Sequence, residues 1–170
     1  MLKFYYVNEE YIRHLKATDP RVPNISYATN QKFVCGIVFQ IQNGLDYYAP
    51  VSHNTSVHRT SIIIKSASGR PLSSIRFSYM IPVPDRSLLE ELRFSEIAKS
   101  SPKYARLLMQ EHDFCIRHEA DILAKAEKVY RYGCDPNNFY YQFCCNFKQL
   151  ESASLLWMSD TAAEKEPLPV

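Results

Sequence analysis

Lysine, histidine and hydroxyl side chains flank two apolar segments in the first third of the chain. Lys32 comes directly before the first segment, and the second is followed by Ser52, His53 and Thr55. An ammonium group can bind a phosphate oxygen, an imidazole titrates near neutral pH, and a hydroxyl can donate a hydrogen bond. Together these groups suit phosphodiester chemistry that needs no metal ion.

These groups meet only if the two apolar segments pair with each other. Both segments, 33–41 and 45–51, are rich in β-branched and aromatic residues, and Asn43-Gly44 lies between them. Asn-Gly accommodates the positive φ angles of a tight turn, so the pattern predicts a β-hairpin. Neighbouring antiparallel strands are about 5 Å apart, so the hairpin brings the groups at its two outer ends together.

Hydrophobic periodicity predicts the other elements. Further strand patterns occupy 2–7, 60–66 and 74–83. Helix patterns run from the cap Asn8 to Asp19, from the cap Ser87 to Lys99, from Pro102 without interruption to Gly133, and over 147–158 after the cap Asn146. We therefore expect an α+β fold with about four helices around a twisted antiparallel sheet of five or six strands.

Length and composition are those of a single globular domain. The 170 residues are 46% hydrophobic and 22% charged, which favours one domain over residues 1–159. The acidic, proline-containing segment 160–170 is predicted to be disordered. The five cysteines form no CxxC motif, and no secretory or membrane-length apolar segment is visible, so a cytoplasmic protein with reduced thiols is expected.

Charge and motif content narrow the function classes. The net charge of +2 does not by itself indicate a nucleic-acid-binding protein, although basic residues prevail in the first half of the chain. His112 and His118 are six residues apart and do not share a helix face, and the cysteine spacing does not fit structural zinc. The four glycines form no phosphate-binding loop motif, so neither a metal nor a cofactor is expected.

Short segments spread over most of the chain match one known family in order and at similar spacing. They are Lys3-Phe4-Tyr5, Tyr11-Ile12-X-X-Leu15, Asp19-X-Arg21-Val22-Pro23, Lys32, Gly36-Ile37-Val38, Tyr48-Ala49-Pro50-Val51-Ser52, Met80-Ile81-Pro82-Val83 and Cys145-Asn146-Phe147. Each segment alone is a weak signal, but the ordered set is specific. On these residues the chain resembles the ToxN/AbiQ family of type III toxins, and within it the CptN branch.

The resemblance implies a metal-independent endoribonuclease on a partial barrel akin to the MazF and Kid toxins. RNA supplies its own nucleophile, the 2′-hydroxyl, and cleavage would leave a 2′,3′-cyclic phosphate and a 5′-hydroxyl. The resemblance assigns catalytic roles to Lys32, to a hydroxyl at Ser52 and to Tyr27, although the spacing at Tyr27 differs by about one residue from the family pattern.

The chain departs from the family pattern directly after Ser52. Better-known members continue with Ser-Pro-Lys, whereas this chain has His53, Asn54 and Thr55, so the second lysine is missing. We predict that His53 has taken a proton-transfer role and that Thr55 keeps a polar contact. Two further residues of the same segment, His58 and Arg59, are reserve candidates.

The resemblance also implies an RNA partner. Family members are inhibited by a repeated antitoxin RNA that folds as a pseudoknot, which they process and with which they form a closed assembly, here a heterohexamer or heterotetramer. The substrate would be mRNA, and the outcome growth arrest or abortive infection by phage; no DNA or membrane is implied. The residues expected to bind RNA are Lys3, Arg21, Asn54, His58, Arg59, Lys65, Arg70, Arg76 and Lys103.

Two other classes of function remain open on the sequence. A non-catalytic RNA-binding module with the same elements would bind RNA without producing new 5′-hydroxyl ends. A toxin of the CcdB type would arrest growth by acting on a protein target, without cleaving RNA.

Overall fold

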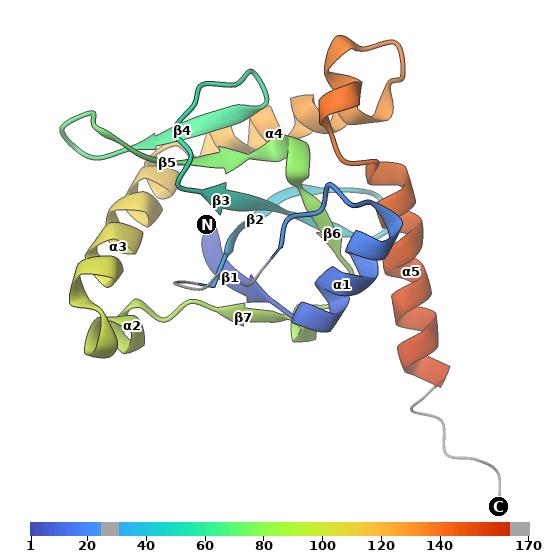
Figure 1. Ribbon diagram of the computed structural model, residues 1–170, viewed down its shortest axis with the longest axis horizontal. Coiled ribbons are helices and arrows are strands. Elements are labelled where there is room, and N and C mark those ends of the chain that lie inside the picture. Colours follow the sequence, from blue (N-terminus) through green and yellow to red (C-terminus); the bar gives the residue numbers. More distant parts are fainter. Residues whose placement is uncertain (25–30, 164–170) are drawn as a thin grey trace, which may run out of the picture.

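Seven antiparallel strands form the sheet in the computed structural model, which describes residues 1–24 and 31–163 (Figure 1). The strands are β1 (Lys3–Val7), β2 (Val34–Gln40), β3 (Asp46–Ser52), β4 (Ser61–Lys65), β5 (Pro71–Arg76), β6 (Ile81–Val83) and β7 (Leu89–Glu91). Their order is β4-β5-β3-β2-β1-β7, and β6 pairs with β3. The predicted α+β class is confirmed, with more strands in these ranges than expected.

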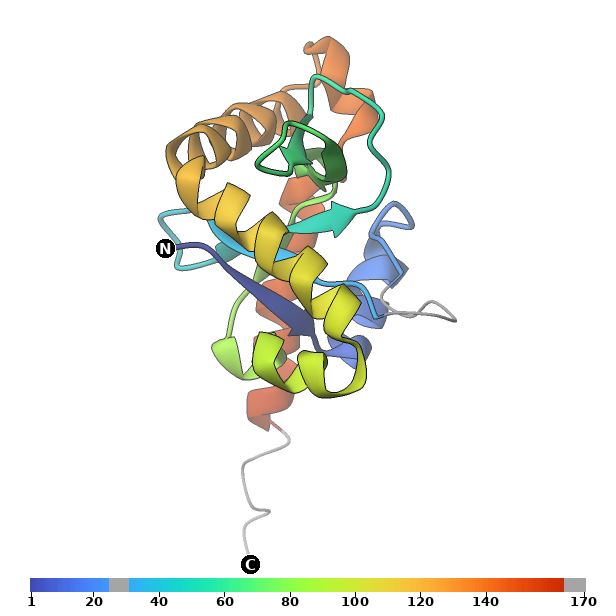
Figure 2. The ribbon, with the colours of Figure 1, turned by 90° about the vertical axis from the view of Figure 1, so that its left-hand side faces the viewer.

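Helices cover the sheet from several sides. They are α1 (Glu9–Thr18), α2 (Phe94–Ser100), α3 (Pro102–Arg117), α4 (Glu119–Cys134) and α5 (Phe147–Ala163), with 3-10 turns η1 (Phe77–Tyr79), η2 (Arg86–Leu88) and η3 (Phe139–Phe143). Helix α3 contacts β4 and β5, and α4 contacts β2 and β4, as the side view of Figure 2 illustrates. Helix α5 packs against α1 and β6, on the side of the molecule opposite α3 (Figure 1).

The Asn43-Gly44 hairpin is confirmed. The amide of Gly44 donates to the carbonyl of Ile41 at 3.1 Å, and Gly44 has φ of 84°, a conformation that favours glycine. Strands β2 and β3 then pair down to Val34 opposite Pro50. The turn therefore directs the two outer strand ends to the same edge of the sheet.

A bulge interrupts the β2–β3 ladder between the turn and the outer ends. Gly36 faces Tyr48, but the next paired residue on β2 is Phe39, which faces Tyr47. Gly36 is required beside the bulge because a Cβ atom there would collide with the Tyr48 ring. The fully buried Tyr48 ring therefore packs directly over the glycine backbone.

The predicted caps of the first and last helices are confirmed. The side-chain oxygen of Asn8 accepts a hydrogen bond from the amide of Tyr11 at 2.9 Å, and that of Asn146 accepts one from Gln149 at 3.2 Å. Helix α5 continues to Ala163, beyond the predicted end at Met158 and into the segment expected to be disordered. Residues 164–170 lie outside the described ranges.

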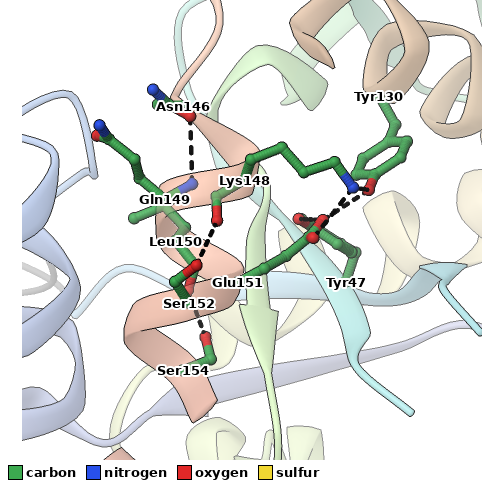
Figure 3. A network of polar contacts seen from close by, with 9 residues as sticks. All are labelled: Tyr47, Tyr130, Asn146, Lys148, Gln149, Leu150, Glu151, Ser152 and Ser154. Atoms are coloured by element: carbon green, nitrogen blue, oxygen red, sulfur yellow. Dashed lines mark hydrogen bonds and ion pairs between the residues drawn. The ribbon is translucent and has the colours of Figure 1, made fainter. Parts of the chain in front are cut away.

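A buried carboxylate joins α5 to the sheet and to α4 (Figure 3). Glu151 accepts hydrogen bonds from the hydroxyls of Tyr47 on β3 at 2.9 Å and Tyr130 on α4 at 2.6 Å. Lys148, one turn earlier on α5, donates to the other carboxylate oxygen at 3.1 Å. Satisfying this buried charge requires all three elements, so the network fixes the position of α5.

The helix predicted over 87–99 is wrong in its first half. Asp85 caps the short turn η2 by accepting from the amide of Ser87 at 2.8 Å, and the chain then extends as β7. Strand β7 pairs with β1, with Tyr5 opposite Glu91. Pairing with a strand far away in the sequence overrides the local helical pattern, and only α2 remains helical.

Two other predicted elements are interrupted. The helix expected from Pro102 to Gly133 breaks at His118, whose φ of −113° and ψ of 22° redirect the chain from α3 into α4. The strand expected over 74–83 divides into β5 and β6 around the turn η1, because the amide of Phe77 leaves the sheet pattern to donate to Thr60. Neither break is marked by glycine or proline.

Within the described ranges, no helix combines the length and apolarity needed to cross a membrane.

Candidate active site

An open pocket of about 410 Å³ lies at the outer end of the β2–β3 hairpin. Its charged and hydrogen-bonding walls include Lys16, Arg21, Lys32, Ser52, Arg76 and Tyr79. Four of these side chains are cationic, and no carboxylate of the described residues lines the pocket. Such a pocket favours an anion, and a phosphate group in particular.

Strand register brings Lys32 and Ser52 together at this pocket. Val34 lies opposite Pro50, and the amide of Val51 donates to the carbonyl of Phe33 at 3.2 Å. If this register is extended by two residues from Val34 and Pro50, Lys32, which precedes β2, comes opposite Ser52. Residues directly opposite each other on antiparallel strands have Cβ atoms about 5 Å apart, close enough for both side chains to touch one phosphate.

Strand β5 supplies Arg76 from the other side of β3. Ser52 lies opposite Ser74, and Val51 lies opposite the fully buried Ile75. Side chains alternate between the two faces of a strand, so Ser74 and Arg76 share the face that carries Ser52, while Ile75 points into the core. The pocket therefore sits on three neighbouring strands.

Arg21 is held in place by Asp19. Its Nε and Nη2 atoms each donate to one carboxylate oxygen of Asp19 at 3.0 Å, and the amide of Asn146 donates to the same carboxylate at 2.7 Å. Burial opposes ionisation of Asp19, but the hydrogen bonds from Arg21 and Asn146 outweigh it and lower the pKa of this carboxyl. Arg21 thus reaches the pocket wall with its charge already paired.

His53 and Thr55 do not line the pocket. Both are exposed on the 53–59 loop, as are Asn54, His58 and Arg59. The start of this loop is nevertheless fixed: the amide of Asn54 donates to the Ser52 hydroxyl at 3.3 Å, and the Ser74 hydroxyl donates to the Asn54 carbonyl at 2.6 Å. His53 therefore sits one residue beyond the pocket, and Tyr27 lies outside the described residues.

The remaining residues expected to bind RNA are dispersed. Arg70 and Lys103 line a second open pocket of about 540 Å³, together with Arg106 and Tyr104. Lys65 is exposed at the end of β4. Lys3 forms an exposed ion pair with Glu91 at 2.8 Å, and the hydrogen bond from Lys3 to Glu91 raises the pKa of its ammonium group.

Sequence reasoning missed two residues of the first pocket. Lys16 lies in the last turn of α1, and its Nζ donates to Asn24. Tyr79 falls within the strand predicted over 74–83, but it lies in the turn η1, which places it on the pocket wall. Only the three-dimensional path of the chain through η1 reveals this position.

The side chains of the pocket walls are hydrogen-bond donors of the kind that bind phosphate groups. In the described part of the chain, no three His, Cys, Asp or Glu side chains are grouped so that they could share a metal ion. The pocket instead offers ammonium and guanidinium groups and a hydroxyl, all of which can donate hydrogen bonds to phosphate oxygens.

Comparison with known proteins gives consistent matches over most of the chain. The family described as "Toxin ToxN, type III toxin-antitoxin system" matches residues 3–154. The endoribonuclease ToxN of Pectobacterium atrosepticum is 30% identical in an alignment of 162 positions, which covers 88% of this chain and 90% of that protein.

Solved structures share the fold as well. A structure of AbiQ, a lactococcal anti-phage endoribonuclease of the type III toxin–antitoxin class, superposes with a TM-score of 0.81 at 27% identity, covering 94% of this chain and 99% of AbiQ. Another, from work on selective toxin inhibition by a non-coding RNA pseudoknot, gives a TM-score of 0.85 at 23% identity over 92% of this chain and 98% of its own. Because its sequence identity is only 23%, this second structure supports a common fold and no more.

Proposed function

The chain belongs to the ToxN family of type III toxin–antitoxin toxins, and from this premise we propose that it is a metal-independent endoribonuclease acting on single-stranded RNA. The observation that carries the proposal is the cationic pocket, whose walls include both Lys32 and Ser52. Curated relatives that match most of the chain are endoribonucleases, which supports the same activity here.

The reaction needs three things from the protein. The 2′-oxygen of RNA attacks the adjacent phosphorus, the bond from phosphorus to the 5′-oxygen breaks, and a 2′,3′-cyclic phosphate and a 5′-hydroxyl result. A base must accept the 2′ proton, an acid must protonate the departing 5′-oxygen, and donors must stabilise the extra negative charge on the phosphate.

Lys32 and Ser52 supply donors for the phosphate. The Lys32 ammonium group offsets the developing charge. The Ser52 hydroxyl accepts a hydrogen bond from the amide of Asn54 at 3.3 Å, so its own proton is available for a phosphate oxygen. One short stretch of the hairpin edge thus provides both a charge and an oriented hydroxyl.

His53 is the proton-transfer group in this proposal. Its backbone lies between Ser52 and Asn54, whose positions are fixed by hydrogen bonds, and its side chain is exposed. RNA bound in the pocket would continue past this residue, within reach of its imidazole, a side chain that can act as a general acid or base. Tyr27 and Thr55 are proposed as further polar contacts of the substrate.

Incubating the purified protein with total RNA in EDTA, followed by mapping of 5′ ends, tests the activity. New 5′-hydroxyl ends are expected from the parent. Replacement Lys32→Ala is expected to slow cleavage by about 10²–10³-fold, and Ser52→Ala and His53→Ala by about 10²-fold each. Lys99→Ala, which removes an exposed lysine paired with Glu96 on α2, is the matched control and should cleave normally.

Each contrary result has a distinct meaning. Normal cleavage by His53→Ala removes the proton-transfer role of this residue and leaves the Lys32–Ser52 pocket in place. Binding of RNA by the parent without new ends favours the non-catalytic RNA-binding module. Growth arrest without RNA cleavage favours a protein target.

We also propose that the inhibitor of this toxin is an antitoxin RNA. A structure of the same fold comes from work in which a non-coding RNA pseudoknot inhibits a type III toxin. The pocket lined by Lys32 and Ser52 is called the active-site pocket below. In this chain it and the Arg70–Lys103 pocket offer two cationic surfaces for the phosphates of one folded RNA. The cellular substrate is mRNA, and the proposed outcome is growth arrest or defence against phage.

A further inference from the structure

Arg76 carries a buried donor that no described residue satisfies. Its Nε atom is buried without a hydrogen-bond partner, and no described side chain or carbonyl accepts a hydrogen bond from the rest of its guanidinium group. A buried N–H group without an acceptor costs about 1–3 kcal/mol, so such groups in folded proteins require an explanation.

The guanidinium group is nonetheless held in place. Its central carbon lies 5.4 Å from the centroid of the Tyr79 ring, an arrangement that a cation and an aromatic face favour. Arg76 and Tyr79 both line the active-site pocket. The charge is therefore positioned before any ligand arrives, although no acceptor among the described residues uses it.

Other cations of the pocket already have partners. Arg21 is paired with Asp19 through two hydrogen bonds, and Lys16 donates to Asn24. Arg76 differs because its described surroundings supply an aromatic ring but no acceptor. Its Nε atom is closed to a ligand, but the side chain lines the pocket, so its outer nitrogens are the atoms that a ligand with oxygen acceptors and negative charge would engage.

The strand ladder places this group beside the proposed reaction centre. Ile75 lies opposite Val51, so extending this register by one residue puts Arg76 opposite Pro50. Pro50 is two residues from Ser52 along β3, on the same face of the strand. Lys32 approaches Ser52 from the strand on the other side. A phosphate resting on the Ser52 hydroxyl would therefore have Lys32 on one flank and Arg76 on the other.

We propose that Arg76 is a catalytic residue that donates hydrogen bonds to a non-bridging oxygen of the scissile phosphate; this inference rests on the proposed ribonuclease function. The forked guanidinium group stays charged throughout the reaction. Its hydrogen bonds become stronger as negative charge grows on the phosphate oxygens. Arg76 exchanges no proton: the 2′ proton leaves to the base, and the 5′-oxygen receives one from the acid. Its contribution belongs mainly to the transition state rather than to RNA binding.

Single-turnover cleavage of a short RNA containing a mapped site tests this role. Arg76→Gln is expected to slow cleavage by about 10²–10³-fold and Arg76→Lys by a smaller factor, because a lysine keeps the charge but loses the fork. Affinity for the same RNA carrying a 2′-deoxy nucleotide at the cleavage site, which cannot react, should change by no more than about fivefold.

Sulfur substitution at the phosphate separates contact from structural support. In the parent, one of the two phosphorothioate diastereomers at the scissile position should react more slowly, because sulfur accepts the Arg76 hydrogen bond poorly. In Arg76→Gln this difference between diastereomers should shrink, because the part that depends on Arg76 is lost while the contacts of Lys32 and Ser52 remain. Arg93→Gln, which removes an exposed arginine at the start of α2, is the matched control and should keep the parental difference.

The outcomes separate the inference from the proposed function. If the parent cleaves and a folded Arg76→Gln protein cleaves within about threefold of it, the catalytic role of Arg76 is overturned while the ribonuclease function stands. A slow variant that keeps the parental diastereomer difference also overturns it, since the arginine would then act only through the fold. If Arg76→Gln unfolds, Arg76→Lys carries the same diastereomer comparison. A parent that never cleaves RNA overturns the proposed function and this inference together.

Discussion

At the scale of single residues, Asp19 joins three parts of the chain that the pocket needs. It follows α1, binds the guanidinium group of Arg21 and accepts the amide of Asn146 at the start of α5. The carboxylate is almost completely buried, with a residue exposure of 3%. An ionised group in such a place is stable only while these hydrogen bonds persist.

Replacing Asp19 with Asn should destabilise the protein by about 2 kcal/mol at neutral pH, because a neutral amide cannot accept both Arg21 donors and the Asn146 amide. The pKa of Asp19 is lowered in the folded state, so its contribution is present above the ordinary carboxyl pKa of about 3.9 and disappears as the pH falls through the lowered value. Urea unfolding from pH 3 to pH 7 measures this difference.

The control for this experiment is Asp113→Asn, an exposed aspartate on α3. It should keep the parental dependence of the unfolding free energy on pH. A variant at Asp19 that unfolds at the parental urea concentration at both ends of the pH range would contradict the role assigned to this carboxylate.

Prediction at the residue scale reached part of the pocket. Lys32 and Ser52 were available from the sequence because the Asn43-Gly44 turn fixes which strand ends meet. The position of His53 just outside the pocket was not available, since the direction of a side chain at a strand end depends on the loop that follows. The roles of Arg76 and Tyr79 depend on the turn η1, which no glycine or proline marks.

At the scale of elements, the packing of α3 against the sheet encloses a carboxyl group without a partner. Glu111 of α3 has an exposure of 0%, and among the described residues neither of its side-chain oxygens has a hydrogen-bond partner. Burial raises the pKa of this carboxyl, and the nearby Ser73 hydroxyl on β5 opposes the shift only in part. The contact of α3 with β5 therefore favours the protonated, uncharged form.

The replacement Glu111→Gln should stabilise the protein by about 1–2 kcal/mol at pH 8. Since the folded pKa of Glu111 is raised, the parent loses stability as the pH rises from the ordinary carboxyl pKa of about 4.3 through the raised value. The glutamine variant lacks this loss, so its unfolding free energy should vary less over that range. Thermal unfolding at pH 5 and pH 8 measures it.

Glu90→Gln is the matched control, because Glu90 is exposed on β7. It should follow the parental profile. A parallel pH profile for the parent and Glu111→Gln would show that Glu111 is charged and satisfied in the folded protein, contrary to the packing described above.

Element prediction succeeded where local signals agree with tertiary packing. Helices α1 and α5 begin at the expected asparagine caps, and β2 and β3 follow the expected hairpin. It failed at β7, where pairing with β1 competes with a helical pattern, and at His118, where the helix changes direction without a helix-breaking residue. Those outcomes depend on contacts distant in the sequence, which periodicity does not report.

At the scale of the whole molecule, two cationic pockets are formed by different elements. The active-site pocket combines the β2–β3 edge with β5, whereas Arg70 precedes β5 and Lys103 lies in the first turn of α3. Their wall residues do not overlap. An RNA that engages one pocket on each of two protein molecules would link them, which is a route to a closed assembly.

Co-expression with its antitoxin RNA should therefore yield a species larger than the 19.7 kDa chain in gel filtration. Treatment with ribonuclease should return the protein to the monomer position, because the links are made by RNA. The double variant Arg70→Gln, Lys103→Gln should shift the equilibrium toward smaller species. It should weaken binding most at low salt and make the affinity less dependent on salt, because fewer phosphate contacts remain. A large species that survives ribonuclease would instead indicate direct contacts between proteins.

The bulge at Ile37 and Val38 has a practical consequence for the hairpin. The ladder changes register at this point, so the turn decides which strand ends meet, whereas the segment from Val34 to Gly36 sets the register next to the pocket. At the tip of the hairpin, Gln42 and Asn43 are exposed, whereas Gly44 must keep its positive φ. A fluorescent label or a short epitope attached at this tip should leave the arrangement of the pocket unchanged. The labelled toxin could then be followed while it keeps its ribonuclease activity.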